Sequence, residues 1–213
     1  MDIDHIFIFT DNKGKAADDL VSFGLTEGES RVHEGQGTTN RTFVFDNFFL
    51  EVLWVHNEQE IKSDLIRPTG LWKRANYRVN SCSPFGVCIT NTDETEQLFK
   101  NAFNYQPDYF PSGMTIDILN NNTNLDLPWI FRLPFRREKK ETKQSAHKNG
   151  ISILTNADFQ YTDKGENQLL DHFKNEEKIL FSFGDETWLT LTFDNGIQGL
   201  SQKFDNLKLT VNY

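Results

Sequence analysis

The stretch GQGTTNRTFVFDNFFLEVLWV at residues 35–55 contains two runs of β-branched and aromatic residues behind a Gly-rich turn. The runs cover residues 41–46 and 48–55, and the pair Asp46 and Asn47 between them is typical of a tight turn. Because so short a connection joins only neighbouring strands, these residues predict an antiparallel hairpin.

The residues before the hairpin add a strand, a helix and a further strand. IDHIFIF at 3–9 predicts a strand. Apolar residues at helical spacing over 15–23, followed by Gly24, predict a short helix and its end. Another short strand is expected over 30–34. Together with the hairpin, these elements form a βαβββ unit.

A charged connector follows this unit. Residues 56–82 contain Pro68 and Gly70, which interrupt regular structure, and we expect one or two helical turns around 71–75. The first βαβββ module and its connector therefore cover residues 1–82.

A similar order recurs twice further along the chain. GVCITNT at 86–92 and GISILTN at 150–156 match HIFIFTD at 5–11 in length and in their polar, helix-entry ending. We expect a second module over 83–146 and a third, partial module over 147–213 in the same domain. Expected strands are 85–90, 114–119, 129–135, 150–154, 178–183, 187–193 and 207–212, expected helices 94–103 and 167–173, and expected turns or loops 120–124 and 136–148.

Composition narrows the class of protein. The 213 residues carry a formal net charge of −9, so nucleic acid is not an expected partner. No apolar run approaches the roughly 20 residues of a membrane span, and the N-terminus lacks the pattern of a signal peptide. Cys82 and Cys88 are expected to be free buried thiols, and the cytoplasm is the expected location. A basic cluster is expected to be a solvated loop or an anion-binding patch: Arg132, Arg136, Arg137, Lys139 and Lys140.

Five segments in order resemble the glyoxalase-like branch of the vicinal oxygen chelate superfamily. They are DHIFIF at 4–9, the stretch at 35–55, SPFGVCIT at 83–90, PWIFRLPF at 128–135 and HKNGISIL at 147–154. The resemblance implies an α+β fold in which paired βαβββ modules form curved mixed sheets around a cup-shaped pocket. In that superfamily the cup holds a divalent metal bound by His and Glu. Its members include isomerases, dioxygenases, epimerases, thiol transferases and metal-free antibiotic sequestrants, so the fold does not fix the reaction.

His5 and Glu51 match the first-module metal ligands of that family. The pattern alone also singles them out, since His5 alternates with Phe7 and Phe9, and Glu51 with Phe49, on apolar strand faces. A buried carboxylate is costly unless it is paired or metal-bound. The two are candidate ligands of one divalent ion (zinc, nickel, manganese or iron), with Glu51 also the candidate catalytic residue. Alternatively, no metal binds, and they hydrogen-bond each other or nearby backbone.

The later modules depart from the family pattern. The positions that match His5 and Glu51 fall near Gly86 and near Phe131 or Arg132 in the second module, and near Gly150 and Thr190 in the third. Two protein ligands rarely hold a catalytic metal. Tight metal binding is therefore expected to be absent, or to depend on a ligand outside these positions. Residues that could complete a set are His33, Asp117 and His147.

The candidate ligand-binding residues are Asn40, Arg41, Trp54, Trp129 and Arg132. Arg41 offers a bidentate fork for a carboxylate or phosphate, or else pairs within the protein. Arg41 and Arg132 are expected to favour anionic ligands, and the aromatic residues are expected to line the cup or the core.

Three functions follow. The first is a glyoxalase-like lyase, isomerase or dioxygenase with a degenerate metal site. The second is a metal-free protein that binds or sequesters a small anionic or aromatic molecule. The third is an interaction module with a relict pocket. The expected partner is a small-molecule ligand, and a homodimer is compatible with the sequence.

Overall fold

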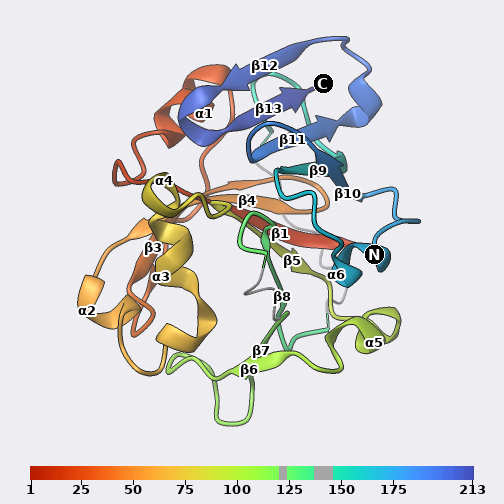
Figure 1. The fold of residues 1–213 in the computed structure, drawn as a ribbon. Helices are drawn as coiled ribbons and strands as arrows, with labels where there is room; N and C mark the ends of the chain where they lie inside the picture. Colours follow the sequence, from red (N-terminus) through yellow and green to blue (C-terminus); the bar gives the residue numbers. More distant parts are fainter. Residues whose placement is uncertain (120–123, 137–145) are drawn as a thin grey trace.

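The structure is a computed structural model that describes residues 1–119, 124–136 and 146–213. It contains an eight-stranded and a five-stranded sheet with short helices around them (Figure 1). This confirms the α+β class with curved mixed sheets. The turn expected over 120–124 and the loop expected over 136–148, with most of the basic cluster, lie largely outside the described residues. No described helix is long and apolar enough to span a bilayer.

The first half of the eight-stranded sheet contains the hairpin of residues 35–55. The two hairpin strands pair Thr38 with Val55 at one end and Val44 with Phe49 at the other. The N-terminal strand lies parallel to the second hairpin strand and antiparallel to the first strand of the next unit, so it joins the two halves. The elements are β1 (Ile3–Phe9), α1 (Ala17–Phe23), β2 (Val32–His33), β3 (Thr38–Val44) and β4 (Phe49–Val55).

The second half completes the sheet in the order β2-β3-β4-β1-β5-β8-β7-β6. The helix expected over 94–103 ends at Phe99, because Phe103–Tyr105 instead pairs with Ile116–Ile118 as a strand. The elements are β5 (Phe85–Ile89), η2 (Asp93–Thr95), α5 (Glu96–Phe99), β6 (Phe103–Tyr105), β7 (Ile116–Ile118) and β8 (Trp129–Arg132).

The third unit forms the five-stranded sheet, in the order β10-β9-β11-β13-β12. The strand expected over 150–154 begins only at Leu154, because the amides of Ser152 and Ile153 donate to the Asp194 carboxylate at 2.9 Å. One strand, β12, was not expected. The elements are β9 (Leu154–Tyr161), α6 (Gln168–Asp171), β10 (Ile179–Phe183), β11 (Trp188–Phe193), η3 (Asp194–Gly196), β12 (Ser201–Phe204), η4 (Asp205–Leu207) and β13 (Leu209–Asn212).

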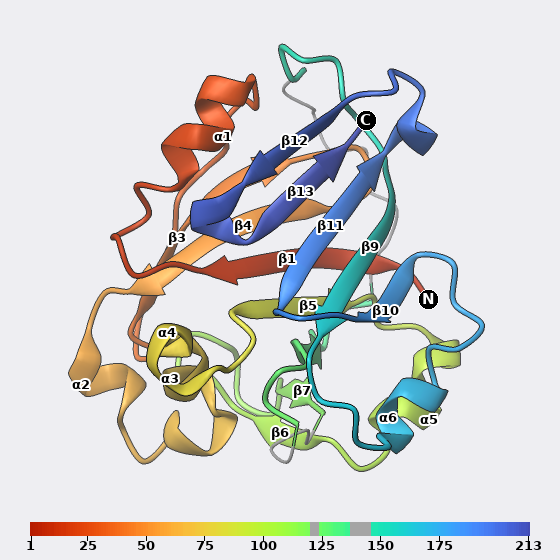
Figure 2. The ribbon, with the colours of Figure 1, turned by 45° about the horizontal axis from the view of Figure 1, so that its top comes forward.

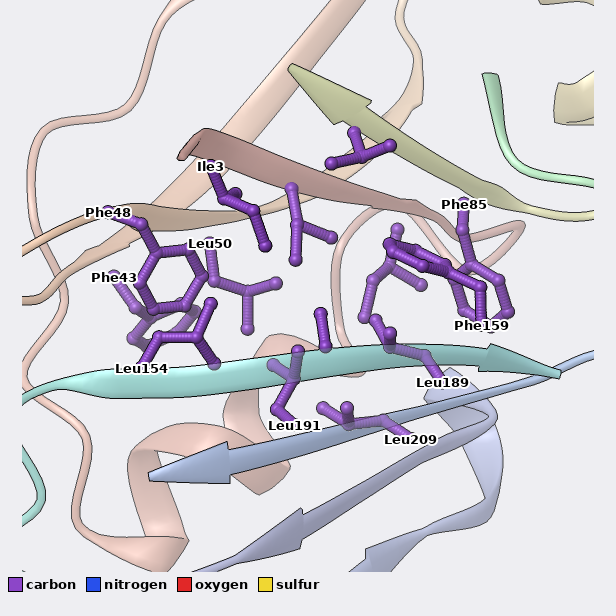
Figure 3. Packing of buried hydrophobic residues seen from close by; sticks show 14 of the residues in the cluster. Ile3, Phe43, Phe48, Leu50, Phe85, Leu154, Phe159, Leu189, Leu191 and Leu209 are labelled. Atoms are coloured by element: carbon purple, nitrogen blue, oxygen red, sulfur yellow. The ribbon is translucent and has the colours of Figure 1, made fainter. Parts of the chain in front are cut away.

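The two sheets pack face to face, and the strands of the smaller sheet cross β1 obliquely (Figure 2). Their shared core is apolar, with Phe43 and Leu50 from one sheet facing Leu154 and Leu191 from the other (Figure 3). Because strand side chains alternate, this packing uses one face of the larger sheet. The opposite face carries a second apolar cluster that includes Phe7 and Phe131, and it is left to form the cup.

The connector packs beside the cup as a chain of short helices. In it, the guanidinium of Arg74 is almost fully buried and donates to the carbonyls of Ser83 at 3.2 Å and Leu127 at 2.7 Å. Burial lowers the pKa of Arg74 to about 10, which still leaves it charged at neutral pH. Arg74 thereby ties the connector to the second half of the sheet. The elements are α2 (Glu58–Ile61), η1 (Arg67–Thr69), α3 (Leu71–Ala75) and α4 (Tyr77–Asn80).

Candidate functional site

A cavity of about 360 Å³ lies on the free face of the eight-stranded sheet. This is within the size range of small-molecule sites. It is bounded by strands of both halves, by Leu71 of the connector and by Tyr109 and Phe110, which follow β6. Strands β1, β3 and β4 of the first half form one wall, and β8 of the second half, together with Phe7 of β1, forms the other.

The first wall is polar, and we call His5, Asn40 and Glu51 the polar wall. The parallel register of β1 and β4 pairs His5 with Phe49 and Phe7 with Glu51, which turns His5 and Glu51 to the same face. Both line the cavity and both are buried. Their placement on adjacent strands around one cavity agrees with the alternation in the sequence.

Asn40 provides a hydrogen-bond donor for the buried carboxylate of Glu51. Its Nδ2 donates to Oε1 of Glu51 at 2.8 Å, and its Oδ1 accepts from the backbone N–H of Arg31 at 2.7 Å. Strand pairing explains the contact, because β3 pairs Asn40 with Leu53 and Thr42 with Glu51, so that Asn40 sits diagonally beside the carboxylate. The buried carboxylate therefore has a donor within the protein.

His5 is enclosed by aromatic rings and polar groups. Its Nδ1 lies 2.7 Å from Oδ1 of Asp4, and its ring stacks on Phe49 with centroids 4.5 Å apart. Burial lowers the pKa of His5, but Cys88 and the carboxylates of Asp4 and Glu51 together raise it well above its ordinary value. Burial also raises the pKa of the Cys88 thiol, so the thiol is neutral at pH 7. The carboxylates of Asp4 and Glu51 then remain as the charges that favour the protonated form of His5.

Two further titratable groups line the cavity. Burial lowers the pKa of His33, whose Nδ1 lies 2.9 Å from Oγ1 of Thr38, so His33 is neutral at pH 7. Burial raises the pKa of Tyr109 to about 12, and its hydroxyl donates to Oε1 of Gln36 at 3.1 Å. Both groups offer uncharged polar contacts to a bound molecule.

The second wall is apolar, and we call Phe7, Trp129 and Phe131 the aromatic wall, since the ring of Phe7 on β1 packs against the two residues of β8. The centroids of Trp129 and Phe131 lie 4.5 Å apart. The indole N–H of Trp129 donates to the carbonyl of Thr69 at 2.9 Å, which turns its apolar edge to the cavity. Trp129 thus lies in the cavity wall, as the sequence suggested.

Three other ligand-binding candidates lie outside this cavity. Arg41 alternates with Asn40, so it faces away, where it pairs with Glu27 at 2.6 Å and Asp18 at 2.7 Å. Trp54 is likewise on the far side of β4, where its ring packs so closely on Gly14 that a Cβ there would lie 2.5 Å from it.

Arg132 follows Phe131 and so points to the other face of β8. Its Nε donates to Asp117 at 2.8 Å, and its Nη2 lies 3.2 Å from Glu96. The structure therefore brings neither Arg41 nor Arg132 to the cup. Of the residues considered as additional metal ligands, His33 lines the cavity, Asp117 pairs with Arg132, and His147 accepts from the N–H of Thr26 at 2.9 Å.

The metal site that the family resemblance implies does not fit these residues. Glu51 already accepts from Asn40, and the second half of the sheet supplies no ligand at the equivalent positions. The ring of Phe7 lies where a side chain on Gly86 would stand, only 2.1 Å from an added Cβ. At the other position, the Phe131 ring faces the cavity. We therefore derive no chemical step through a metal held by His5 and Glu51.

Two features of the site were not evident in the sequence. Arg31 lines the cavity, and its guanidinium lies 5.4 Å from the centre of the Tyr109 ring. Beside the cavity, single ligand atoms of Asp4, His5 and Cys88 all lie within 4.8 Å of one another. Neither Asp4 nor Arg31 could be identified from the sequence pattern. Regular strand alternation would turn Asp4 away from His5, and Arg31 lies in a short, irregular segment.

A family model described as a glyoxalase-like domain matches residues 3–115. No curated protein matches the sequence. Among solved structures, a hypothetical protein from Staphylococcus aureus superposes with a TM-score of 0.59 at 11% identity, covering 99% of this chain and 98% of that one. A methylmalonyl-CoA epimerase from Streptomyces coelicolor gives a TM-score of 0.40 at 14% identity, covering 62% and 96%.

Proposed function

Because the chain belongs to the glyoxalase-like domain family, we propose that its cup is a binding site for a small aromatic molecule with one anionic group. The observation that carries the proposal is the division of the cavity into an aromatic wall and a rim that holds Arg31. Apolar rings supply contact area, and a few polar groups fix orientation, which is the usual composition of a small-molecule site.

The aromatic wall accounts for the ring of the ligand. Phe7, Trp129 and Phe131 are buried in the protein yet line the cavity, together with Phe49 and Phe110. Rings stack favourably in offset or edge-to-face geometry and add about 0.5–1.5 kcal/mol per pair beyond area burial. A flat, apolar ligand therefore matches this surface.

Arg31 accounts for the anionic group. Among the described residues that line the cavity, it is the one Arg or Lys side chain. It is exposed and has no ion-pair partner within the described part of the chain. By contrast, Arg41 and Arg132 are held by acidic side chains. An unpaired guanidinium is free to bind a carboxylate through two parallel hydrogen bonds.

The carboxylate of Glu51 lies deeper in the cup and has partners within the protein. Glu51 accepts from Asn40 and faces the imidazole of His5, so the carboxylate is compensated before any ligand enters. The carboxylate of Glu29 at the rim would repel an anionic group. The anionic group of the ligand should therefore lie close to Arg31. Binding in this form requires no metal.

The test is a matched pair of probes titrated by calorimetry in buffer that contains a chelator. Phenylacetate and 1-naphthoate are compared with their neutral amides, which have the same ring and nearly the same shape. We expect each carboxylate to bind at least about tenfold more tightly than its amide, which corresponds to about 1.4 kcal/mol. Arg31→Gln should remove this difference.

Arg41→Gln is the matched control, because it removes an arginine of the neighbouring strand that faces away from the cup. It should keep the preference for the carboxylates. Equal affinity for acid and amide, or equal loss in the two arginine variants, would overturn the proposal. Absence of measurable binding for all four probes would also count against it.

A further inference from the structure

A β-bulge in β1 brings three metal-ligating side chains together next to the cup. Along the β1–β5 ladder, Ile3 pairs with Ile89, but His5 pairs with Cys88. Between these two pairs, β1 advances by two residues while β5 advances by one, so Asp4 is the extra residue of the bulge. In a bulge, two residues of one strand oppose a single residue of the other, and bulges often redirect a side chain at a functional site. Here Asp4 and His5 both oppose Cys88.

We propose that Asp4, His5 and Cys88 form a binding site for a zinc ion. One ligand atom of each residue lies within 4.8 Å of the other two. In a tetrahedral zinc site with ligands at about 2.0–2.3 Å, the ligand atoms are about 3.5 Å apart. A small closing of side chains around an ion is enough to reach that geometry.

The chemistry of the three donors fits zinc. A thiolate, an imidazole nitrogen and a carboxylate oxygen are the donor types that zinc takes in proteins, and thiolate disfavours magnesium and calcium. His5 and Cys88 are each more than nine-tenths buried. The ion would therefore bind in a largely dry environment, where charge–charge attraction is strong. Three protein ligands leave one of four coordination positions open.

Zinc binding replaces contacts that the three residues make without it. The Asp4 carboxylate and the His5 ring share a hydrogen bond, and the Cys88 thiol lies near the carbonyl of Ile89 at 3.9 Å. When zinc binds, the Cys88 thiol and the protonated His5 ring each lose a proton to solvent, and zinc–sulfur and zinc–nitrogen bonds form. The carboxylate and one ring nitrogen turn to the ion. Each step uses only the ion and these side chains.

This site differs from the one implied by the family resemblance, because Glu51 is not among its ligands. Glu51 hydrogen-bonds Asn40 on the other side of His5. The difference makes the two sites separable by substitution. It also separates this proposal from the proposed function, because ligand binding to the cup is measured in chelator and zinc binding is not.

The experiment is elemental analysis of protein purified without affinity metal resin, loaded with zinc and then dialysed against metal-free buffer. We expect the wild-type chain to retain one zinc ion. Cys88→Ala and Asp4→Asn should each lower zinc affinity by at least about tenfold. Cys82→Ala, which removes the other buried thiol, and Glu51→Gln should keep it. Asp4→Asn keeps the side-chain shape at a partly exposed position, so it tests the site even if Cys88→Ala fails to fold.

Cobalt substitution supplies a second readout. Cobalt bound to a thiolate gives an intense near-ultraviolet charge-transfer band, which we expect in the wild type and in Cys82→Ala but not in Cys88→Ala. Absence of stoichiometric zinc from the wild type would overturn the proposal. Retention of zinc and of the band in Cys88→Ala would do the same, as would loss of zinc in Glu51→Gln alone.

Discussion

The two walls of the cup differ in chemistry, although the two halves of the sheet have the same strand order. The polar wall comes from the first half, and the aromatic wall combines Trp129 and Phe131 of the second half with Phe7 of β1. The polar wall holds an imidazole, an amide and a carboxylate that contact or face one another. The aromatic wall offers rings, and its one polar atom near the cavity, the indole N–H of Trp129, is used by the carbonyl of Thr69. Related modules thus reproduce the shape of a cup, while the buried imidazole and carboxylate lie in the polar wall alone among the described residues.

The difference indicates how binding and stability are divided. In the aromatic wall, the residues that would touch a ligand are also core residues, so substitutions there should destabilise the fold. In the polar wall, hydrogen bonds compensate buried charge, so the cost of a change depends on which partner is left behind. At the rim, Arg31 is exposed and has no ion-pair partner among the described residues, so a substitution there should affect binding more than stability.

The largest expected effect is in the aromatic wall. Phe131→Ala should lower the free energy of unfolding by about 3–5 kcal/mol, because it removes a large buried ring and leaves a void. Urea denaturation followed by fluorescence measures the loss. Phe103→Ala, in the same half of the sheet but substantially exposed, should cost far less. Similar losses in the two variants would show that the aromatic wall is not part of the core.

The next effect is in the polar wall. Asn40→Leu leaves the buried carboxylate of Glu51 without its donor and should cost about 2–3 kcal/mol. Adding Glu51→Leu to the same chain removes the stranded carboxylate and should restore part of that loss. A double-mutant cycle from denaturation curves gives the coupling. Strictly additive costs would mean that Asn40 and Glu51 do not depend on each other.

A smaller effect concerns pH. Because the folded-state pKa of His5 lies above its unfolded value of about 6.5, its charge stabilises the fold below that pH. This contribution falls as pH rises through the raised folded pKa. In chelator, Asp4→Asn should therefore cost about 1 kcal/mol at pH 6 and progressively less in alkaline buffer. A cost that grows with pH would contradict the raised pKa.

The smallest effect on stability is expected at the rim. Arg31→Gln should change the free energy of unfolding by less than about 0.5 kcal/mol, because the side chain is exposed and lacks an ion-pair partner among the described residues. Thermal melts with and without 1-naphthoate separate the two roles. A large loss of stability in the absence of ligand would show that Arg31 stabilises the fold and does not act only in binding.

Much of the fold could be predicted because alternation and turn chemistry are local. The hairpin at 35–55 and the strand at 3–9 formed close to their expected bounds. The same alternation explains two of the candidates outside the cup: Arg41 is adjacent to Asn40 and therefore faces the opposite side of the sheet, and Arg132 is related to Phe131 in the same way. Which face of a strand points into the cup is fixed by the register of strand pairing. That register depends on partner strands that are distant in the sequence.

The bulge was beyond sequence reasoning for a similar reason. Nothing in DHIFIF distinguishes a regular strand from one in which Asp4 is an extra residue, because the bulge exists only relative to β5. Likewise, Tyr109 and Phe110 reach the cavity from an irregular segment whose path depends on tertiary packing. The sequence predicts which residues share a strand face better than which loops meet it.

The burial of Arg74 has a consequence for how the molecule opens. Its guanidinium belongs to α3, but its acceptors are carbonyls at Ser83 and Leu127, at the entrances to β5 and β8. If those strand entrances separated from the connector, a buried charged group would lose these acceptors, which is costly in an apolar interior. The connector and the second half of the sheet should therefore open together as one cooperative unit. Leu71, on the same helix, lines the cup, so transient opening of the cup and loosening of this unit would be a single event.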